Sequence, residues 1–266
     1  MPTTTIKGYA DGPTGQIHYQ MAGDGMPLIL CHQSPASSDM FAQVYHRLAA
    51  RGIKAIGIDT PGFGMSDLPD EIPTIQDYAG AIIAVMDHLD LQKTAILGHH
   101  TGASIAVEVA TAAPERISRI ILNGPAVLTE AERNEFRAAL KTAPSFDIKK
   151  DGSHLTNIWQ RRAQFTPGWT SVEAMHRGVV QMLMAGEMEW YGHNAAFAHD
   201  ISVPLKALTQ PTLILTNTGD DIYYAAQRAR ELRPDFAYLE LEGGTHDIVD
   251  EQPDDWTQAV ADFLEP

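Results

Sequence analysis

The stretch Gly98-His99-His100-Thr101-Gly102 constrains the fold more than any other part of the chain. It follows the apolar run Thr94-Ala95-Ile96-Leu97, which is typical of a buried strand, and it precedes a segment whose apolar residues have helical spacing. Glycines on both sides of a strand-to-helix junction predict a sharp turn that lifts the central side chain, here His100, above the carboxyl edge of a sheet. The stretch therefore predicts a strand–turn–helix unit with one reactive position at its apex.

Apolar runs and segments of helical period alternate along most of the chain. Helices are expected from Ser37, from Thr74, after Gly102, over Ala225–Leu232 and over Trp256–Leu264, and Thr74-x-x-Asp77 resembles a capping box. The expected strands lie at residues 6–9, 16–21, 27–31, 54–58, 94–97, 117–122, 212–215 and 237–241. Because strands alternate with helices, the pattern predicts an α/β fold with a mostly parallel sheet covered by helices on both faces, and the run 27–31 is apolar without alternation, as a strand covered on both faces would be.

The alternation stops between about Val127 and Lys206. This segment contains helical pieces that begin near Thr129, Ser153 and Ser171, with loops at Pro144 and Pro167-Gly168, and no convincing strand. We expect a core domain made of residues 1–127 and 207–266, with residues 128–206 inserted as a helical cap.

Composition narrows the class of protein further. Acidic residues outnumber basic ones 34 to 19, for a formal net charge of −15, which argues against nucleic acid or an anionic membrane as a partner. Without a basic and apolar leader or a run of about 20 apolar residues, the chain is expected to be cytoplasmic. The single cysteine, Cys31, excludes an intrachain disulfide and is expected to be buried. The oligomeric state is left open.

Two further residues are expected at the same sheet edge as His100. Asp220, with Asp221 beside it, comes just after the strand 212–215, and His246 follows Gly243-Gly244 after the strand 237–241. The carboxyl ends of parallel strands meet at one edge, where open α/β sheets bind ligands. Because an acid and then a histidine follow a glycine-flanked strand-to-helix turn in that order along the chain, His100, Asp220 and His246 are predicted to be catalytic.

A loop opposite the turn is expected to bind the substrate. His32-Gln33-Ser34-Pro35 follows the strand 27–31, and backbone amides there, together with the amide of Thr101, could hold a developing oxyanion. Gln33, Ser34 and Thr101 are the predicted oxyanion and substrate-binding residues. The glycine-rich stretch Asp59–Asp67 is interpreted as structural.

These motifs together resemble the α/β-hydrolase superfamily, in the branch of haloalkane dehalogenases, epoxide hydrolases, C–C bond hydrolases and esterases. The resemblance spans nearly the whole chain outside the cap and implies an α/β-hydrolase fold with a nucleophile, acid and histidine in that chain order. Two positions depart from the family pattern. Gln33 replaces the glycine of His-Gly-x-Pro, and His100 stands where Ser, Asp or Cys is usual.

Four interpretations of His100 remain open. It could be the nucleophile, with His246 as base and Asp220 as its orienter. It could form a general acid–base pair with His246, since an imidazole pKa of about 6.5 leaves much of it neutral at pH 7. His100, His246 and Asp220 could bind a metal, with His32 nearby. The protein could also bind a ligand without turning it over.

The leading hypothesis is an enzyme without a cofactor or metal that hydrolyses a small or medium apolar ester or related acyl compound, with a small molecule as its partner. A lyase-like acid–base enzyme and a degenerate ligand-binding protein are the alternatives. Arg161, Arg162 and Arg177 could orient a substrate carboxylate, but helical spacing favours solvent-facing positions for them. His99 is expected to pack beneath the turn, and His193 has no partner pattern in the sequence.

Overall fold

The computed structural model describes residues 4–142, 147–164 and 171–265. The loop positions predicted at Pro144 and Pro167-Gly168 lie outside these ranges. Within them, eight strands form one sheet in the order β1-β2-β4-β3-β5-β6-β7-β8. The strands are β1 (Ile6–Gly12), β2 (Gly15–Ala22), β3 (Met26–Cys31), β4 (Ile53–Ile58), β5 (Thr94–His99), β6 (Ile117–Asn123), β7 (Thr212–Asn217) and β8 (Ala237–Leu241).

The sheet is mostly parallel. β1 pairs antiparallel with β2, and β2 pairs antiparallel with β4, whereas all pairs from β4 through β8 are parallel. Every residue of β5 and of β7 is buried, as expected for central strands covered on both faces. The predicted α/β class, with a mostly parallel sheet, is confirmed.

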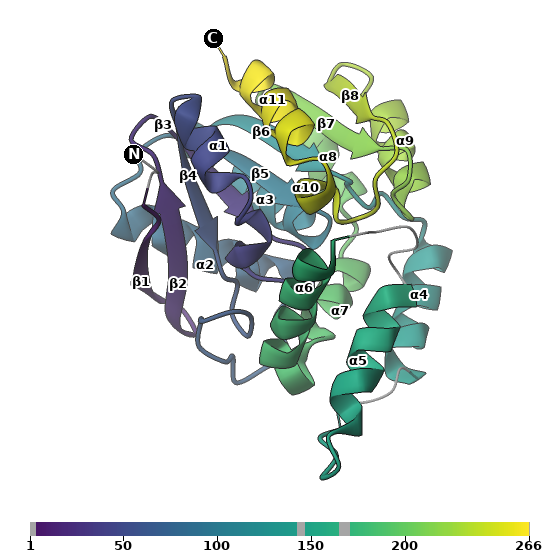
Figure 1. Cartoon of the computed structure of the whole chain (residues 1–266). Coiled ribbons are helices and arrows are strands. Elements are labelled where there is room, and N and C mark those ends of the chain that lie inside the picture. The colour runs from purple at the N-terminus through teal and green to yellow at the C-terminus, as the bar shows by residue number, and fades with distance from the viewer. Residues whose placement is uncertain (1–3, 143–146, 165–170, 266) are drawn as a thin grey trace.

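Helices cover both faces of the sheet (Figure 1). One apolar layer joins the sheet to α2 (Ile75–His88), α3 (Thr101–Ala112) and α8 (Ser202–Ala207). The opposite layer joins it to α1 (Tyr45–Ala50) and α11 (Pro253–Leu264), and includes buried Trp256. α9 (Tyr223–Leu232) follows β7, and the short α10 (Ile248–Glu251) precedes α11. The predicted capping box at Thr74 and Asp77 is present.

The helix predicted from Ser37 is interrupted. A 3₁₀ turn at Ser38–Phe41 comes first, and α1 begins only at Tyr45. The Tyr45 hydroxyl donates to the Ser38 carbonyl (3.0 Å), and the Ser38 amide donates to Asp59 (2.7 Å). The bond to Asp59 ties the first turn to the loop after β4, and the bond from Tyr45 holds the start of α1 against this turn. Met40, Val44 and Leu48 are buried.

Between β6 and β7 the described residues contain helices and no strand. They are α4 (Glu130–Thr142), α5 (Ser153–Gln164), α6 (Val172–Ala185), η3 (Gly186–Met188), α7 (Tyr191–Ala198) and α8. In Figure 1, α4, α5, α6 and α7 lie together in the lower part of the view, away from α11. None of the helices in the described ranges is long and apolar enough to cross a membrane.

Candidate active site

His100 occupies the apex of the turn between β5 and α3. Its backbone angles are φ 50° and ψ −109°, and only Asp90 among the other described non-glycine residues has a positive φ. A Cβ on Gly98 would lie 1.9 Å from the Gly102 carbonyl oxygen, and a Cβ on Gly102 would lie 2.1 Å from the Cys31 carbonyl oxygen. Both glycines are therefore required for the close crossing that places His100 above the sheet edge.

His100 pairs with Asp220. Its Nε2 lies 2.7 Å from Oδ2 of Asp220, whose side chain is fully buried and whose Oδ1 accepts from the Ile222 amide at 3.0 Å. Burial opposes protonation of His100, but the charge of Asp220 and this hydrogen bond outweigh it and raise the pKa of His100. The same interaction lowers the pKa of Asp220, although burial acts in the opposite direction.

Gly124, just after β6, leaves room for this pair. Its φ is +58°, and a Cβ there would lie 2.5 Å from Cδ2 and 2.6 Å from Nε2 of His100, and 2.9 Å from Oδ2 of Asp220. The absence of a side chain at residue 124 is thus a requirement of the His100–Asp220 contact.

His246 is engaged elsewhere. Its ring centroid is 6.5 Å from that of His100, and the two rings share no hydrogen bond. Nε2 of His246 lies 3.0 Å from Nη1 of Arg162 and 3.2 Å from Oδ2 of Asp247, and Nδ1 lies 3.7 Å from Asp221. Burial, aided by Arg162 and His100, lowers the pKa of His246 against the attraction of Asp247. The arrangement expected for a His100 nucleophile, with Asp220 orienting His246, is not the one in this structure.

Arg162 reaches the site from α5. It is buried, and its Nη2 donates to Asp247, while Nε2 of Gln33 donates to the other oxygen of Asp247 at 3.3 Å. Arg161 donates to both oxygens of Glu189 at 2.6 Å, and Arg177 donates to Asp250 at 2.5 Å. The expectation that these three arginines face solvent is wrong. Arg161 and Arg162 of α5 and Arg177 of α6 are each bound to a carboxylate, and these acids lie at the end of η3, next to His246 and on α10.

The predicted substrate-binding loop lies opposite the turn. Gln33 directs its amide toward Asp247, so its departure from the family pattern links this loop to the residue next to His246. Within the described part of the chain, the amides of Ser34 and Thr101 donate no hydrogen bond. Two backbone donors at the carboxyl ends of β3 and β5 are therefore free to bind an oxygen of a ligand.

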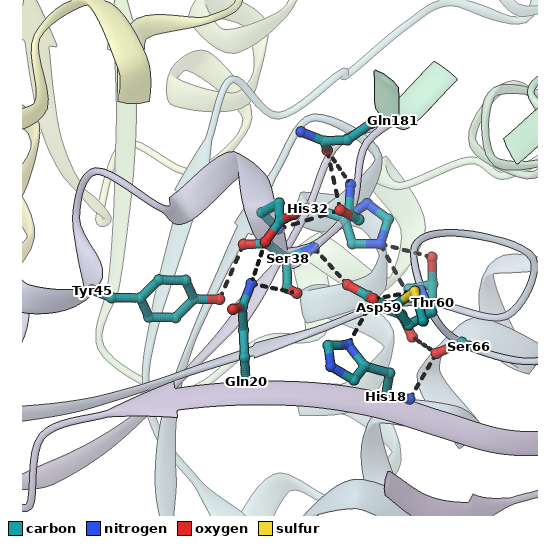
Figure 2. Close-up of polar contacts among 12 residues, drawn as sticks. His18, Gln20, His32, Ser38, Tyr45, Asp59, Thr60, Ser66 and Gln181 are labelled. Carbon is teal, nitrogen blue, oxygen red and sulfur yellow. Dashed lines mark hydrogen bonds and ion pairs between the residues drawn. The ribbon is translucent and has the colours of Figure 1, made fainter. Parts of the chain in front are cut away.

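A buried polar network supports this loop from behind (Figure 2). Asp59 accepts from His18 Nδ1 (2.8 Å), from the Ser38 amide (2.7 Å) and from the Met65 amide (2.8 Å). Nδ1 of His32 lies 2.8 Å from the Gln33 carbonyl oxygen, and its Nε2 accepts from the Thr60 amide at 3.1 Å. Burial lowers the pKa of His32, so the neutral ring satisfies both contacts. His32 therefore fixes the backbone that leads into Ser34, and Asp59 fixes the turn at Ser38 that follows it.

A cavity of about 480 Å³ lies between the sheet edge and the helices α4, α5, α6 and α7. Four of the predicted residues line it together with His100: Gln33, Ser34, Thr101 and His246. Asp220 lies behind His100. Much of the other lining is apolar and includes Met40, Leu128, Phe136, Leu140, Met182 and Phe197. His193 and Asp247 also line the cavity, and neither was predicted from the sequence as a site residue.

The arrangement does not form a metal centre. Nε2 of His100 is bonded to Asp220, and Nε2 of His246 faces Arg162 and Asp247. Across residues 4–142, 147–164 and 171–265, no group of three His, Cys, Asp or Glu side chains is placed to hold a metal ion. Of the four interpretations of His100, the metal site has no geometric support.

Comparison with known proteins agrees with this architecture. Residues 26–253 match the family model for the alpha/beta hydrolase fold, and the chain belongs to that family. A non-heme chloroperoxidase of Streptomyces lividans is 26% identical over 249 residues, covering 87% of this chain and 88% of the relative. Haloalkane dehalogenase 2 of Mycobacterium tuberculosis is 25% identical over 270 residues, covering 94% and 92%.

Solved structures show the same fold. A thermophilic esterase from Thermogutta terrifontis superposes with a TM-score of 0.81 at 20% identity, covering 97% of this chain and 98% of the esterase. Epoxide hydrolase A from Mycobacterium thermoresistibile also has a TM-score of 0.81, at 18% identity and 98% coverage of both chains.

Proposed function

We propose that the protein is a hydrolase that cleaves a small or medium uncharged ester or related acyl compound, with His100 and Asp220 acting as a base and its orienting carboxylate. The observation that carries this proposal is the 2.7 Å contact between His100 Nε2 and buried Asp220 at the apex of the turn. In catalytic triads a carboxylate holds one ring nitrogen of a histidine so that the other accepts a proton. Here Nε2 is held, and Nδ1 is left to accept the proton.

A base role for His100 fits the surroundings better than a nucleophilic one. An acyl-imidazole on His100 would need a second base to activate water, and His246 is instead bound to Arg162 and Asp247 with a lowered pKa. His100 itself is a stronger base than an ordinary histidine because of Asp220. Direct attack by water therefore requires fewer groups than a covalent route.

The proposed reaction balances with the residues at hand. A water oxygen attacks the acyl carbon while Nδ1 of His100 takes its proton, and the carbonyl oxygen becomes an oxyanion held by the amides of Ser34 and Thr101. Each such donor is worth about 3–4 kcal/mol in a preorganised site. Collapse of the intermediate breaks the bond to the leaving oxygen, which receives the proton from His100. The names of the esterase and epoxide hydrolase neighbours support hydrolysis as the reaction type.

The test is a panel of short-chain nitrophenyl esters and lactones, measured with the wild type and with H100A, D220N and H246A. We expect kcat to fall about 100-fold or more in H100A and D220N, the range of a lost general base. Rapid-quench mass spectrometry should find no acyl group on the wild-type chain during turnover. Equal rates in all four proteins would remove these residues from the mechanism, and an acylated His100 would establish the nucleophilic route instead.

The same dyad supports a second candidate, a lyase-like enzyme that moves a proton without adding water. A base facing two oxyanion donors can also abstract a proton beside a carbonyl group. Turnover in ¹⁸O-labelled water separates the two, since only hydrolysis places solvent oxygen in the product. Ligand binding without any product from the panel would favour the degenerate ligand-binding protein.

A further inference from the structure

His193 joins the cavity from α7, and the proposed mechanism does not use it. Its ring lies 5.8 Å from the ring of Phe197 at an interplanar angle of 18°, and Phe197 lies 4.9 Å from Phe136 of α4 at 24°. All three side chains line the cavity that also contains His100 and His246. We refer to Phe136, Phe197 and His193 as the ring ladder. It forms a wall of nearly parallel rings on the cap side of the site.

The two ring nitrogens of His193 have no partner in the described protein. Within the described ranges, neither nitrogen forms a hydrogen bond or an ion pair, and neither is fully buried. The ring is only partly buried, so its nitrogens keep accessible surface, and the cavity is what the side chain lines. A group bound in the cavity can therefore reach them.

Packing alone does not explain a histidine at this position. A phenylalanine would extend the stack on Phe197 equally well, and it would not bring two polar atoms that need partners. Their accessible surface faces the cavity, so packing gains nothing from them, and a ligand that covered them without a hydrogen bond would lose about 1–3 kcal/mol for each. Burial, with repulsion from His100, His246 and Arg161, lowers the pKa of His193 to about 4, so the ring stays neutral and offers one donor and one acceptor.

The charges around the cavity restrict what the ring can bind. Arg161 and Arg162, which line it, are paired with Glu189 and Asp247, and Asp250 is paired with Arg177. Asp221 adds a further negative charge. An anionic ligand would meet no uncompensated cation among the described lining residues. An uncharged ligand with a flat apolar part suits the ring ladder, since ring pairs of this kind gain about 0.5–1.5 kcal/mol beyond burial of area.

We propose that His193 is a substrate-binding residue that hydrogen-bonds a hydroxyl or carbonyl group carried on the aromatic part of an uncharged substrate, while that part lies against the ring ladder. The inference rests on the proposed function in taking this cavity as the substrate site. It adds the substrate class, a hydroxy- or oxo-substituted aryl ester, and it adds a residue that sets the preference among such compounds. Aryl ketones, which have no leaving oxygen, serve as unreactive probes of this site.

The test measures binding and needs no turnover. Dissociation constants for acetophenone, 3-hydroxyacetophenone and 4-hydroxyacetophenone are determined by calorimetry with the wild type, H193F, H193N and H46F. H193F keeps a ring on Phe197 and removes both nitrogens, while H193N retains hydrogen-bonding groups. H46F is the control, because His46 is exposed on α1. Thermal unfolding verifies that each variant is folded.

We expect the wild type and H46F to bind one hydroxy ketone about 3- to 10-fold more tightly than acetophenone, the value of one neutral hydrogen bond. H193F should lose this preference while binding acetophenone within about twofold of the wild type, and H193N should keep part of it. The inference would be overturned if H193F kept the preference, or if H193F bound all three ketones equally more weakly. It would also be overturned if the wild type bound none of them at millimolar concentration.

The outcome is separable from that of the proposed function. A hydroxyl preference that depends on His193, in a protein that releases no product from esters, would leave the inference standing and remove the hydrolase. Ester hydrolysis that depends on His100, without any effect of H193F on ketone binding, would support the hydrolase and remove the inference about His193.

Discussion

At the scale of single residues, the site depends on a strained backbone at His100 and a buried acid beside it. A non-glycine residue in such a conformation costs about 1–3 kcal/mol, and that cost persists only where the surrounding structure enforces it. Here the glycines on either side of the turn and the contact with Asp220 enforce it. The position that holds Ser, Asp or Cys in the resembled family thus carries an imidazole whose Nε2 is bonded to Asp220.

D220N should change the pH dependence of catalysis. In the proposed mechanism the neutral form of His100 is the base, so kcat should rise with pH through the pKa of His100, which Asp220 raises. Removing the negative charge lowers this pKa, and the rising limb of the pH profile should move to lower pH while the plateau falls. The measurement is kcat from pH 5 to pH 9 for both proteins. A limb that stays in place would show that another group controls the rate.

G124A should separate the effect of backbone strain at residue 124 from the loss of the His100–Asp220 contact. An alanine at residue 124, where φ is +58°, would place its Cβ against His100 and Asp220, so activity should fall about 100-fold or more. G52A is the matched control, because Gly52 has φ +72° with nothing within 4 Å of its Cβ position. Both variants should lose about 1–2 kcal/mol of unfolding free energy from the left-handed backbone. Similar activity in the two variants would contradict the requirement for space at Gly124.

The sequence predicts where these residues lie better than what they contact. A turn flanked by glycines and loops that follow apolar strands places His100, Asp220 and His246 at one edge, because strand direction alone decides that. Which ring nitrogen meets which carboxylate depends on side-chain positions within a few ångströms. The pairing of Asp220 with His100, and of His246 with Arg162, therefore had no signal in the order of residues. Arg162 and His193 could be assigned to the site only once the helices are placed, and nothing in the sequence singled out Asp247.

At the scale of elements, two cap helices are fastened to the core by polar contacts. Arg162 of α5 binds Asp247, Arg177 of α6 binds Asp250, and Gln181 of α6 accepts from the Ser37 amide at 2.7 Å. The starts of α4, α5 and α6 follow from capping residues such as Ser171, whose side chain accepts from the Ala174 amide. Their docking does not follow from the sequence, since an arginine on an amphipathic helix has the same spacing whether it faces solvent or a buried acid.

R162M should destabilise the protein strongly. It would leave Asp247 without its buried guanidinium partner, and breaking a buried pair costs about 3–5 kcal/mol. The double variant R162M/D247L removes the second charge as well and should recover a large part of that loss. Urea unfolding gives the free energies. R47M is the control, because Arg47 pairs with the exposed Asp254 and should cost less than about 1 kcal/mol. A similar loss in R162M and R47M would show that the buried pair does not fasten α5.

At the scale of the whole molecule, the net charge and the cavity both disfavour an anionic substrate. The chain has a formal net charge of −15, and the arginines of the cavity are each paired with a carboxylate. The negative charge of the protein repels anions as they approach. The cavity arginines cannot offset this repulsion, because each already pairs with a carboxylate of the protein. The net charge therefore disfavours an anionic substrate, and the paired arginines of α5 do not reverse that preference.

Anionic esters should consequently be poor substrates, and salt should relieve part of the defect. The comparison uses 4-carboxyphenyl acetate and its neutral isostere 4-carbamoylphenyl acetate. At about 0.01 M salt the screening length is about 30 Å, and we expect kcat/KM for the anion to be about tenfold lower. At about 0.15 M the length falls to about 8 Å, so the gap should narrow while the neutral ester is unaffected. Equal hydrolysis of both esters at low salt, or a preference for the anion, would mean that Arg161 or Arg162 exchanges its carboxylate for the substrate's, and the cavity would then select anions.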